Sequence, residues 1–428
     1  MRPPDARQVA LAAIAAALDR RQSLDDRLDG DKDFAALEPR DRALARAIAA
    51  ETLRHLGQID DLIRRCLERR LPKKAFPARQ ILRMGVAQLL FLGLAPHAAI
   101  ATSVDLAKRE IQPFAKLVNA VLRRLQREGA AMMAEQDAAR LDTPDWLWES
   151  WSAAHGEARA RAIAEAHMRR APLDLTVKSD APAWAERLGA ELLATGSLRL
   201  KPEGDVTQLA GFAEGAWWVQ DAAAALPARL LGDVAGKTVV DLCAAPGGKT
   251  AQLAQAGAHV IAVDLSDRRM ARVEQNLARL GLHAELVSAD AATWRPGEPV
   301  DAVLLDAPCS GTGTIRRHPD IAWIKRPEDV TRLAGLQARL LDNALAMVKP
   351  GGLVVYAVCS LQREEGAGRT EALLARRRDI RIVPVEMGEL GGERDFIDGT
   401  GALATLPCQW PERGGVDGFY AVRLRAIP

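Results

Sequence analysis

Five short apolar segments alternate with helical segments in the C-terminal half of the chain, and this alternation narrows the possible folds more than any other feature. The apolar segments lie at 238–242, 259–264, 284–288, 301–306 and 351–358. Short runs rich in Val, Leu and Ile predict strands that are buried on both faces of a mainly parallel sheet. In such sheets, ligands bind beyond the carboxyl ends of the strands, where the strand order reverses. We therefore expect an α/β domain with its site at that edge.

The first third of the chain has a different pattern, in which apolar residues recur every three or four positions. The stretches VALAAIAAAL, ALARAIAAETL, ILRMGVAQLLFL and FAKLVNAVLRRL all show it. This periodicity predicts amphipathic helices from Pro3 to about Ala131, with short connections near 29–33, 71–77 and 96–97. The segments LDLTVKS and SLRLKP further on alternate like strands. We predict three domains: an all-α domain at 1–135, a small α+β subdomain at 142–232 and the α/β domain at 233–428.

The overall charge does not indicate a partner, because 58 Lys and Arg residues face 56 Asp and Glu residues. Local clustering is more informative. The stretch from position 64 to 83 contains eight basic residues and one acid, Glu68. The basic residues are Arg64, Arg65, Arg69, Arg70, Lys73, Lys74, Arg79 and Arg83. A solvated charged face and a surface that contacts RNA phosphates remain equal alternatives.

The five cysteines lie at positions 66, 243, 309, 359 and 408 and show no CxxC spacing. We expect reduced thiols in a cytosolic protein, with neither a disulfide framework nor a metal site. The start of the chain has no signal-peptide core, and the longest apolar runs, such as 89–95, are too short to span a bilayer. The sequence therefore predicts a soluble, cytoplasmic protein.

The loop CAAPGGKT follows the first strand of the α/β region and opens a helix. Its small residues let the backbone approach a ligand closely, and the helix start offers unpaired N–H groups. A phosphate-binding P-loop is an alternative because the loop ends in GKT, but Cys243 stands where that motif requires glycine. Asp264 ends the next strand, where a carboxylate can accept hydrogen bonds from ribose hydroxyls. Asp290 follows the third strand, and we predict that it reaches an adenine edge.

A helix N-cap is an equally good reading for either acid alone. Their joint placement after consecutive strands favours a nucleoside-bearing cofactor.

Two thiols follow later strands: Cys309 in DAPCSGTG, close to Asp306, and Cys359 in VVYAVCS. Carbon 5 of cytosine is a poor nucleophile, and a thiolate that adds to carbon 6 turns the ring into an enamine. A carboxyl group beside ring nitrogen 3 then stabilises the charge, which fits Asp306. The residues alone do not rank the two thiols. Apolar packing is the simpler reading for Cys66 and Cys408.

CAAPGGKT, DAPCSGTG with the downstream RRHPDI, and the VCS strand end resemble the core motifs of the Nop/Sun family of RNA cytosine-5 methyltransferases. The helical front resembles the NusB-type RNA-binding domain of bacterial members that act on 16S ribosomal RNA. The resemblance covers nearly the whole chain. It implies a Rossmann-like catalytic domain, a monomer that acts on RNA without DNA or membrane partners, and ribosomal RNA as the favoured substrate. Transfer RNA and a non-catalytic assembly factor are the alternatives.

The resemblance also assigns roles to residues. It implies Cys359 as the nucleophile, Cys309 as the residue that assists product release, and Asp306 beside the base. It implies S-adenosylmethionine as the methyl donor, held by Cys243, Ala244, Ala245, Pro246, Gly247, Gly248, Lys249, Asp264, Asp290 and Asp306. Within RRHPDI, Arg316 and Arg317 are candidates for pairing with phosphates. The chain departs from the family pattern at Val358, which replaces a threonine, and at Cys408, which replaces a histidine in many relatives.

Overall fold

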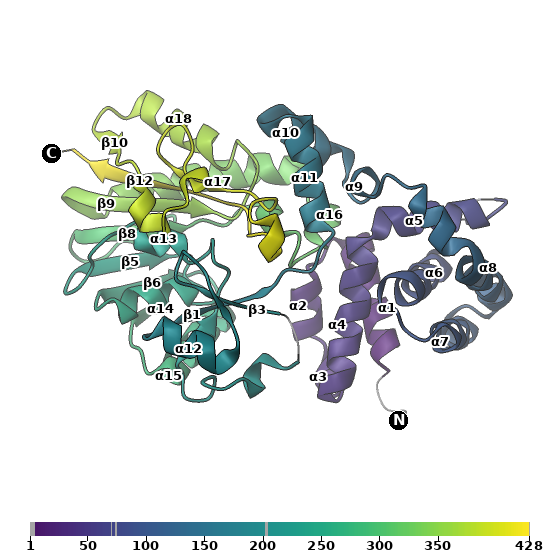
Figure 1. Ribbon diagram of the computed structural model, residues 1–428. Helices are drawn as coiled ribbons and strands as arrows, with labels where there is room; N and C mark the ends of the chain where they lie inside the picture. Colours follow the sequence, from purple (N-terminus) through teal and green to yellow (C-terminus); the bar gives the residue numbers. More distant parts are fainter. Residues whose placement is uncertain (1–4, 70, 73–74, 202–203, 428) are drawn as a thin grey trace. The chain divides into compact units, whose positions relative to one another are not determined.

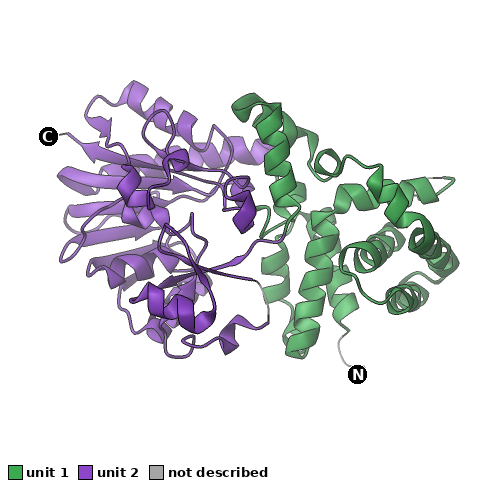
Figure 2. Cartoon of the chain, viewed as in Figure 1, with its two compact units in different colours: residues 1–169, 315–326 green, residues 170–314, 327–428 purple. Residues whose placement is uncertain are grey.

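The computed structural model describes residues 5–69, 71–72, 75–201 and 204–427 (Figure 1). The chain forms two compact units, residues 1–169 with 315–326 and residues 170–314 with 327–428 (Figure 2). The first unit therefore takes a short segment from the C-terminal half of the sequence. The two units are defined by contacts in space and combine segments that are distant along the chain. They do not test the division into domains at 1–135, 142–232 and 233–428, which stays a prediction. None of the described helices has both the length and the apolar character that crossing a membrane requires.

The first unit is built from helices, as the apolar period of its sequence predicts. They are α1 (Ala6–Arg20), α2 (Leu24–Asp29), α3 (Lys32–Ala35), α4 (Pro39–Arg54), α5 (Leu56–Cys66), α6 (Phe76–Val86), α7 (Pro96–Glu110), α8 (Ala115–Ala134), α9 (Ala138–Leu141), α10 (Asp145–His155), α11 (Glu157–His167) and α16 (Ile321–Ile324). The Asp5 side chain caps α1 by accepting a hydrogen bond from the Arg7 backbone N–H at 2.9 Å. Proline occupies the first turn of α4, α6 and α7, where its missing N–H costs nothing.

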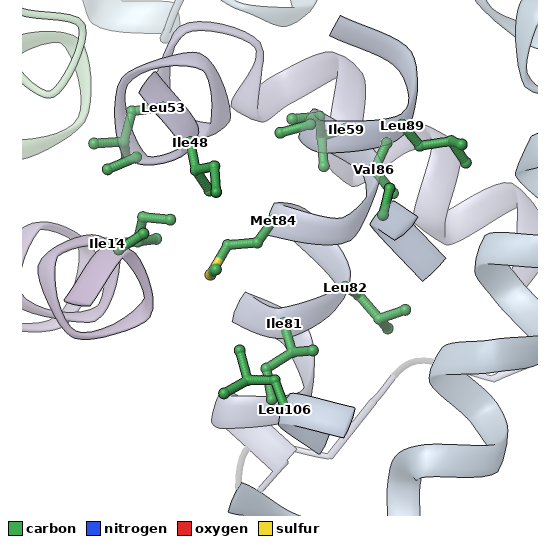
Figure 3. Close-up of a cluster of buried hydrophobic side chains, with 14 of the residues drawn as sticks. Ile14, Ile48, Leu53, Ile59, Ile81, Leu82, Met84, Val86, Leu89 and Leu106 are labelled. Carbon is green, nitrogen blue, oxygen red and sulfur yellow. The ribbon is translucent and has the colours of Figure 1, made fainter. Parts of the chain in front are cut away.

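Apolar side chains from α1 to α8 and from α16 form one shared core. Ile14 of α1, Ile48 of α4 and Met84 of α6 point toward one another, and Ile81 lies against Leu106 of α7 (Figure 3). All five are almost completely buried. Burial of each such side chain stabilises the fold by about 1.5–3 kcal/mol. The spacing of the apolar residues along the helices is therefore the main determinant of the fold of this unit.

The segment 315–326 completes the helical unit through polar and apolar contacts. The Leu24 backbone N–H donates to the buried Asp320 carboxylate at 3.0 Å. The Trp323 indole donates to the Leu53 carbonyl at 2.7 Å, and Ile324 joins the core around α1 and α4. These contacts hold a stretch of the C-terminal half of the sequence inside the helical unit.

Arg54, near the end of α4, ties three backbone segments of this unit together. Its Nη1 donates to the carbonyl oxygens of His167 at 3.0 Å, Arg169 at 3.3 Å and Arg316 at 2.8 Å. Its Nε donates to Glu51 at 3.2 Å, and the side chain is buried. Arg316 is itself only 1% exposed, so its interpretation as a phosphate contact is wrong: the surrounding helices cover it.

The second unit contains an eight-stranded sheet with the order β10-β12-β9-β8-β5-β6-β7, and β11 pairs with β12. Its strands are β5 (Thr238–Leu242), β6 (His259–Asp264), β7 (Glu285–Ser288), β8 (Val300–Asp306), β9 (Val348–Val358), β10 (Ile380–Ile382), β11 (Leu403–Thr405) and β12 (Phe419–Ala426). The strands β5 to β9 are parallel, whereas β10, β11 and β12 pair antiparallel. The predicted mainly parallel α/β sheet is confirmed.

Helices cover both faces of this sheet. They are α13 (Leu226–Arg229), α14 (Gly248–Gln255), α15 (Asp267–Leu280), α17 (Pro327–Leu345) and α18 (Ala367–Arg376). Successive residues of β8 point to opposite faces: Leu304 packs with Leu226 of α13, while Val303 packs with Leu341 of α17. Because both faces are buried, the strands carry apolar residues at consecutive positions.

A smaller antiparallel sheet lies in the same unit. It has the order β2-β3-β1-β4, with β1 (Leu173–Val177), β2 (Glu191–Leu192), β3 (Leu198–Leu200), β4 (Trp217–Val219) and the helix α12 (Ala181–Leu188). The two strands predicted from LDLTVKS and SLRLKP are confirmed as β1 and β3. A buried ion pair joins them, because Arg199 donates to Asp174 from Nε at 2.7 Å and from Nη2 at 2.6 Å. Arg199 also donates to the Gly415 carbonyl at 2.7 Å, which ties this sheet to the loop before β12.

We predict that Arg54→Met lowers the free energy of unfolding by about 3–5 kcal/mol, because it removes one of the partners of the buried Glu51 and the donor that Arg54 provides to three carbonyls. Urea unfolding followed by circular dichroism measures this change. Arg127→Met is the control, since the Arg127 side chain is 67% exposed, and it should stay within about 0.5 kcal/mol of the wild type. A loss below 1 kcal/mol for Arg54→Met would show that Arg54 does not hold the unit together.

Candidate active site

The ends of four parallel strands gather the predicted site residues at one edge of the larger sheet. β5 leads into the loop 243–247, β6 ends at Asp264, β8 ends at Asp306 and β9 is followed by Cys359. The strands β5 and β8 are neighbours, although β6 and β7 come between them in the sequence. The strand order therefore reverses between β5 and β8, and a crevice at such a reversal is the usual ligand site of an open α/β sheet.

The two predicted thiols lie side by side at this edge. The Sγ atoms of Cys309 and Cys359 are 3.4 Å apart, within hydrogen-bond distance for sulfur. The loop that carries Cys309 is held against the end of β9, because the Gly313 backbone N–H donates to the Cys359 carbonyl at 3.0 Å. Gly313 has no room for a side chain, since a Cβ there would lie 2.0 Å from the Gly418 carbonyl oxygen. The fold thus brings together two cysteines that are 50 positions apart in the sequence.

Lys249, in the first turn of α14, and Asp306, at the end of β8, form an ion pair. The Lys249 Nζ lies 2.7 Å from Asp306 Oδ2 and 5.3 Å from the centre of the Phe419 ring. Burial alone would lower the pKa of Lys249, but the charge and hydrogen bond of Asp306 outweigh it and leave that pKa raised. Lys249 is therefore a fixed positive charge that orients the Asp306 carboxylate, which remains 32% exposed.

Two of the cysteines in this unit are held in the thiol form. The hydrogen bond to Cys359, followed by burial, raises the pKa of Cys309 well above its usual range. Burial, followed by the charges of Asp264 and Asp306, raises the pKa of Cys243 to about 12. A thiol is a much weaker nucleophile than a thiolate, so neither group is suited to attack in this state.

The loop after β5 makes a tight turn into α14. The Gly247 N–H donates to the Ala244 carbonyl at 2.8 Å, and Gly247 has a φ of +97°, a conformation that favours glycine. The Ala244 N–H donates to the Val263 carbonyl at 3.1 Å, which pins the loop to the end of β6. The turn places the first backbone N–H groups of α14, which begins at Gly248, at the sheet edge.

The two acids predicted to contact a nucleoside follow adjacent parallel strands, in which Asp264 is paired with Ser288. Asp264 is 2% exposed and accepts hydrogen bonds from the N–H groups of Ala245 at 3.2 Å and Ser266 at 3.1 Å. Ser266 caps α15, so the reading of Asp264 as a helix N-cap is wrong. Asp290 is exposed and accepts from the Ala292 N–H at 2.9 Å within a turn. A glycine turn, a helix start and two acids at one edge fit a nucleoside-bearing cofactor.

The family departure at Val358 is explained by packing. The Val358 side chain is fully buried and belongs to the apolar core on the α17 face of the sheet. This position therefore contributes packing beneath Cys359, and no hydroxyl is available there.

Two buried acids of this site escaped the sequence analysis. Asp241, on β5, accepts a hydrogen bond from Thr250 Oγ1 of α14 at 2.6 Å, while its buried Oδ1 has no protein partner among the described residues. Burial is the main reason that the pKa of Asp241 rises to about 7. Glu365 is completely buried and contacts the residues that follow both cysteines. The sequence signal for Glu365 was weak, because it stands in the polar stretch LQREE, which resembles an ordinary surface loop.

The basic cluster of the helical unit is partly neutralised. Arg83 pairs with Asp60 through Nε at 2.7 Å, and Arg65 pairs with both Asp61 and Glu135 at 2.8 Å. These acids lie outside the range 64–83, which is why the count along the sequence missed them. Arg70, Lys73 and Lys74 lie outside the described residues. RNA contact by the cluster therefore stays a prediction.

Comparisons with known proteins agree with this geometry. The model of the family described as 16S rRNA methyltransferase RsmB/F matches residues 228–425, and that of the NusB family matches residues 4–127. A protein of Vibrio cholerae named Ribosomal RNA small subunit methyltransferase B is 35% identical over 97% of this chain and 96% of its own length. The protein of the same name from Pseudomonas syringae pv. tomato is 38% identical over 98% and 97%.

The fold is also found in a solved structure. The crystal structure of PH0851 superimposes with a TM-score of 0.75, covers 99% of both chains and is 23% identical in sequence. At this level of identity the likeness concerns the fold alone.

Asp241 leads to a prediction about pH. Folding raises the pKa of Asp241 from near 4 to about 7. Below pH 4 the acid is protonated in both the folded and the unfolded state, and the folded state has its full stability. As the pH rises to about 7, the unfolded state loses this proton more easily than the folded state, and the free energy of unfolding falls. Asp241→Asn should therefore gain stability relative to the wild type between pH 4 and 7, by about 4 kcal/mol at most. Thermal melts at a series of pH values measure the difference. Asp267→Asn, which changes an exposed acid, is the control, and a parallel trend for both variants would contradict the prediction.

Proposed function

Because the chain belongs to the RsmB/F family of 16S rRNA methyltransferases, we propose that it methylates carbon 5 of a cytosine in 16S ribosomal RNA. The observation that carries the cytosine assignment is the pair of Sγ atoms 3.4 Å apart beside the Lys249–Asp306 ion pair. Two thiols and a carboxylate at one strand edge match the covalent chemistry that methylation of this carbon requires. The names of the two relatives favour ribosomal over transfer RNA.

S-adenosylmethionine is the methyl donor of this family, and it supplies an electrophilic methyl group when bound. The loop 243–248 would hold it at the start of α14, with Asp264 at the end of β6 as the acceptor for ribose hydroxyls. Asp290 would contact the adenine edge. Lys249, in the first turn of α14, and Asp306, at the end of β8, would lie next to the donor.

We assign the nucleophile to Cys359. Its sulfur forms a bond to carbon 6 of cytosine, and the electron pair of the 5,6 double bond moves into the ring, so that carbon 5 can take the methyl group. As Cys359 loses its proton and adds to the ring, ring nitrogen 3 takes up a proton. Asp306, oriented by Lys249 at the neighbouring strand end, accepts a hydrogen bond from the resulting N–H. The raised pKa of Cys309 keeps the second thiol protonated while Cys359 attacks.

Cys309 acts after methyl transfer. The proton on carbon 5 must then leave, and the bond between carbon 6 and the Cys359 sulfur must break. Once that sulfur is bonded to carbon, it carries no charge, and the contact that raises the pKa of Cys309 is weakened. Cys309 gives its own proton to solvent and takes the proton from carbon 5. The electron pair of that C–H bond forms the 5,6 double bond again, and Cys359 leaves as a thiolate.

A cytosine inside a helix cannot reach this edge, so the base must leave its stack. An RNA-binding unit that grips the substrate would offset the cost of unstacking, and the NusB-like helices are the candidate.

We predict that Cys359→Ala abolishes methyl transfer to 16S ribosomal RNA, because the sulfur that bonds to carbon 6 is removed and the raised pKa of the neighbouring Cys309 keeps that residue in the weakly nucleophilic thiol form. Transfer of a radiolabelled methyl group measures activity, and calorimetry with S-adenosylmethionine should give an unchanged Kd. Cys66→Ala, in the helical unit, is the matched control and should remain active. Activity of Cys359→Ala near the wild-type level would move the nucleophilic role to another residue.

Cys309→Ala should accumulate a covalent complex of protein and methylated RNA, because removal of the carbon 5 proton is blocked after the bond to Cys359 has formed. A slowly migrating band on a denaturing gel reports the complex. The double variant Cys309→Ala/Cys359→Ala should give no band, since the bonding sulfur is missing. Normal turnover of Cys309→Ala without a band would refute its role in release.

A further inference from the structure

One buried acid contacts the residues that directly follow both cysteines. Glu365 lies in the turn between β9 and α18 and is completely buried. Its Oε1 accepts a hydrogen bond from the Ser310 backbone N–H at 2.9 Å. Its Oε2 accepts from the Ser360 hydroxyl at 2.6 Å and also from the Ser310 hydroxyl. Ser310 follows Cys309 and Ser360 follows Cys359, so a single side chain bridges the two loops.

Further bonds fix this bridge on both sides. Gln337 of α17 donates from Nε2 to Glu365 Oε1 at 3.1 Å and to the Pro308 carbonyl at 3.0 Å. Both neighbours of Cys309, residues 308 and 310, are therefore held. The Tyr356 hydroxyl of β9 donates to the Glu365 carbonyl at 2.5 Å, which fixes the backbone of the acid itself.

The carboxylate of Glu365 receives four hydrogen bonds, which fill its four lone-pair positions. A buried carboxylate is costly without such partners, and a well-packed apolar side chain usually stabilises a fold as well or better. The directional bonds of a carboxylate do what apolar packing cannot: they fix the distance between two separate loops.

We propose that Glu365 is a positioning residue that holds the thiols of Cys309 and Cys359 at the separation needed for bond formation and release. The inference rests on the proposed function for its catalytic meaning, because Cys309 must reach the ring while Cys359 is bonded to it. A displacement of about 1 Å in such an arrangement costs on the order of 100-fold in rate. The charge of Glu365 also adds, after Cys359 and burial, to the raised pKa of Cys309.

Two substitutions separate positioning from charge. Glu365→Asp keeps the carboxylate but is one methylene shorter, so it cannot reach both serines, and kcat should fall about 10–100-fold with the KM for S-adenosylmethionine unchanged. Glu365→Gln keeps the length, and serine hydroxyls can accept as well as donate, so it should retain activity within about threefold of the wild type. Glu364→Asp, at the exposed neighbouring glutamate, is the matched control and should behave as the wild type.

A second measurement reports the thiol pair without RNA. Diamide oxidises two adjacent thiols to a disulfide and is itself reduced to the hydrazine, taking up both protons and both electrons. Mass spectrometry of tryptic peptides gives the rate at which Cys309 and Cys359 become linked. This rate should fall at least 10-fold in Glu365→Asp and stay near that of the wild type in Glu365→Gln and Glu364→Asp. Ser360→Ala, which removes one of the four bonds, should shift the rate in the same direction and decides the question if Glu365→Asp does not fold.

The two readouts keep this inference apart from the proposed function. If the RNA proves not to be methylated on cytosine but disulfide formation still depends on Glu365, the positioning role stands and the proposed function fails. If Glu365→Asp links its thiols and turns over like the wild type, the positioning role is refuted. Equal losses in Glu365→Gln and Glu365→Asp would refute it as well, because charge and not length would then control the site.

Discussion

Burial of both faces of the parallel sheet is the constraint on which the catalytic unit depends. In β8, Leu304 lies in the buried cluster on one face of the sheet and Val303 in the cluster on the other, so the middle of the strand, residues 302–305, carries only apolar side chains. Polar groups are accommodated where the strand ends, and there Asp264, Asp306 and Cys359 gather. The strand order reverses between β5 and β8, and such a reversal is the usual place of the ligand site in an open α/β sheet. The chemistry of the site is thus a consequence of what the core excludes.

A few close contacts determine which side chains of the candidate active site are charged. Lys249 supplies one positive charge and is matched to Asp306, while Asp241 and Cys243 are shifted towards their neutral forms by burial. Low local polarity makes each of these contacts stronger than it would be in water. The pKa of Cys309 depends on its neighbour Cys359, and any event that changes the charge of one sulfur changes the proton affinity of the other. Such coupling lets two identical side chains take different roles in one reaction.

Much of the sheet and of the cofactor loop could be predicted from the sequence, because apolar period and turn chemistry are local properties. The strands β5 to β9 and the placement of Cys309, Cys359 and Asp306 at one edge follow from them. Glu365 could not be found in this way, since the four hydrogen bonds to its carboxylate come from three residues in separate stretches of chain, Ser310, Gln337 and Ser360. The same reason hides Glu135 and Asp60, which pair with Arg65 and Arg83, and the burial of Arg316. Neutralisation and burial are tertiary properties that a count along the chain does not record.

The loop that carries Cys309 is anchored from both sides, and this explains why an irregular segment can serve as an exact scaffold. Upstream it leaves β8 at Asp306, and Glu365 and Gln337 hold residues 308 and 310. Downstream, the Gly313 backbone N–H donates to the Cys359 carbonyl at 3.0 Å, and Thr312 Oγ1 accepts from the Leu361 backbone N–H at 3.0 Å. A loop fixed at one end only would sample many positions, and ordering each of its residues during the reaction would cost about 1–2 kcal/mol. Anchoring at both ends meets that cost during folding, before any substrate arrives.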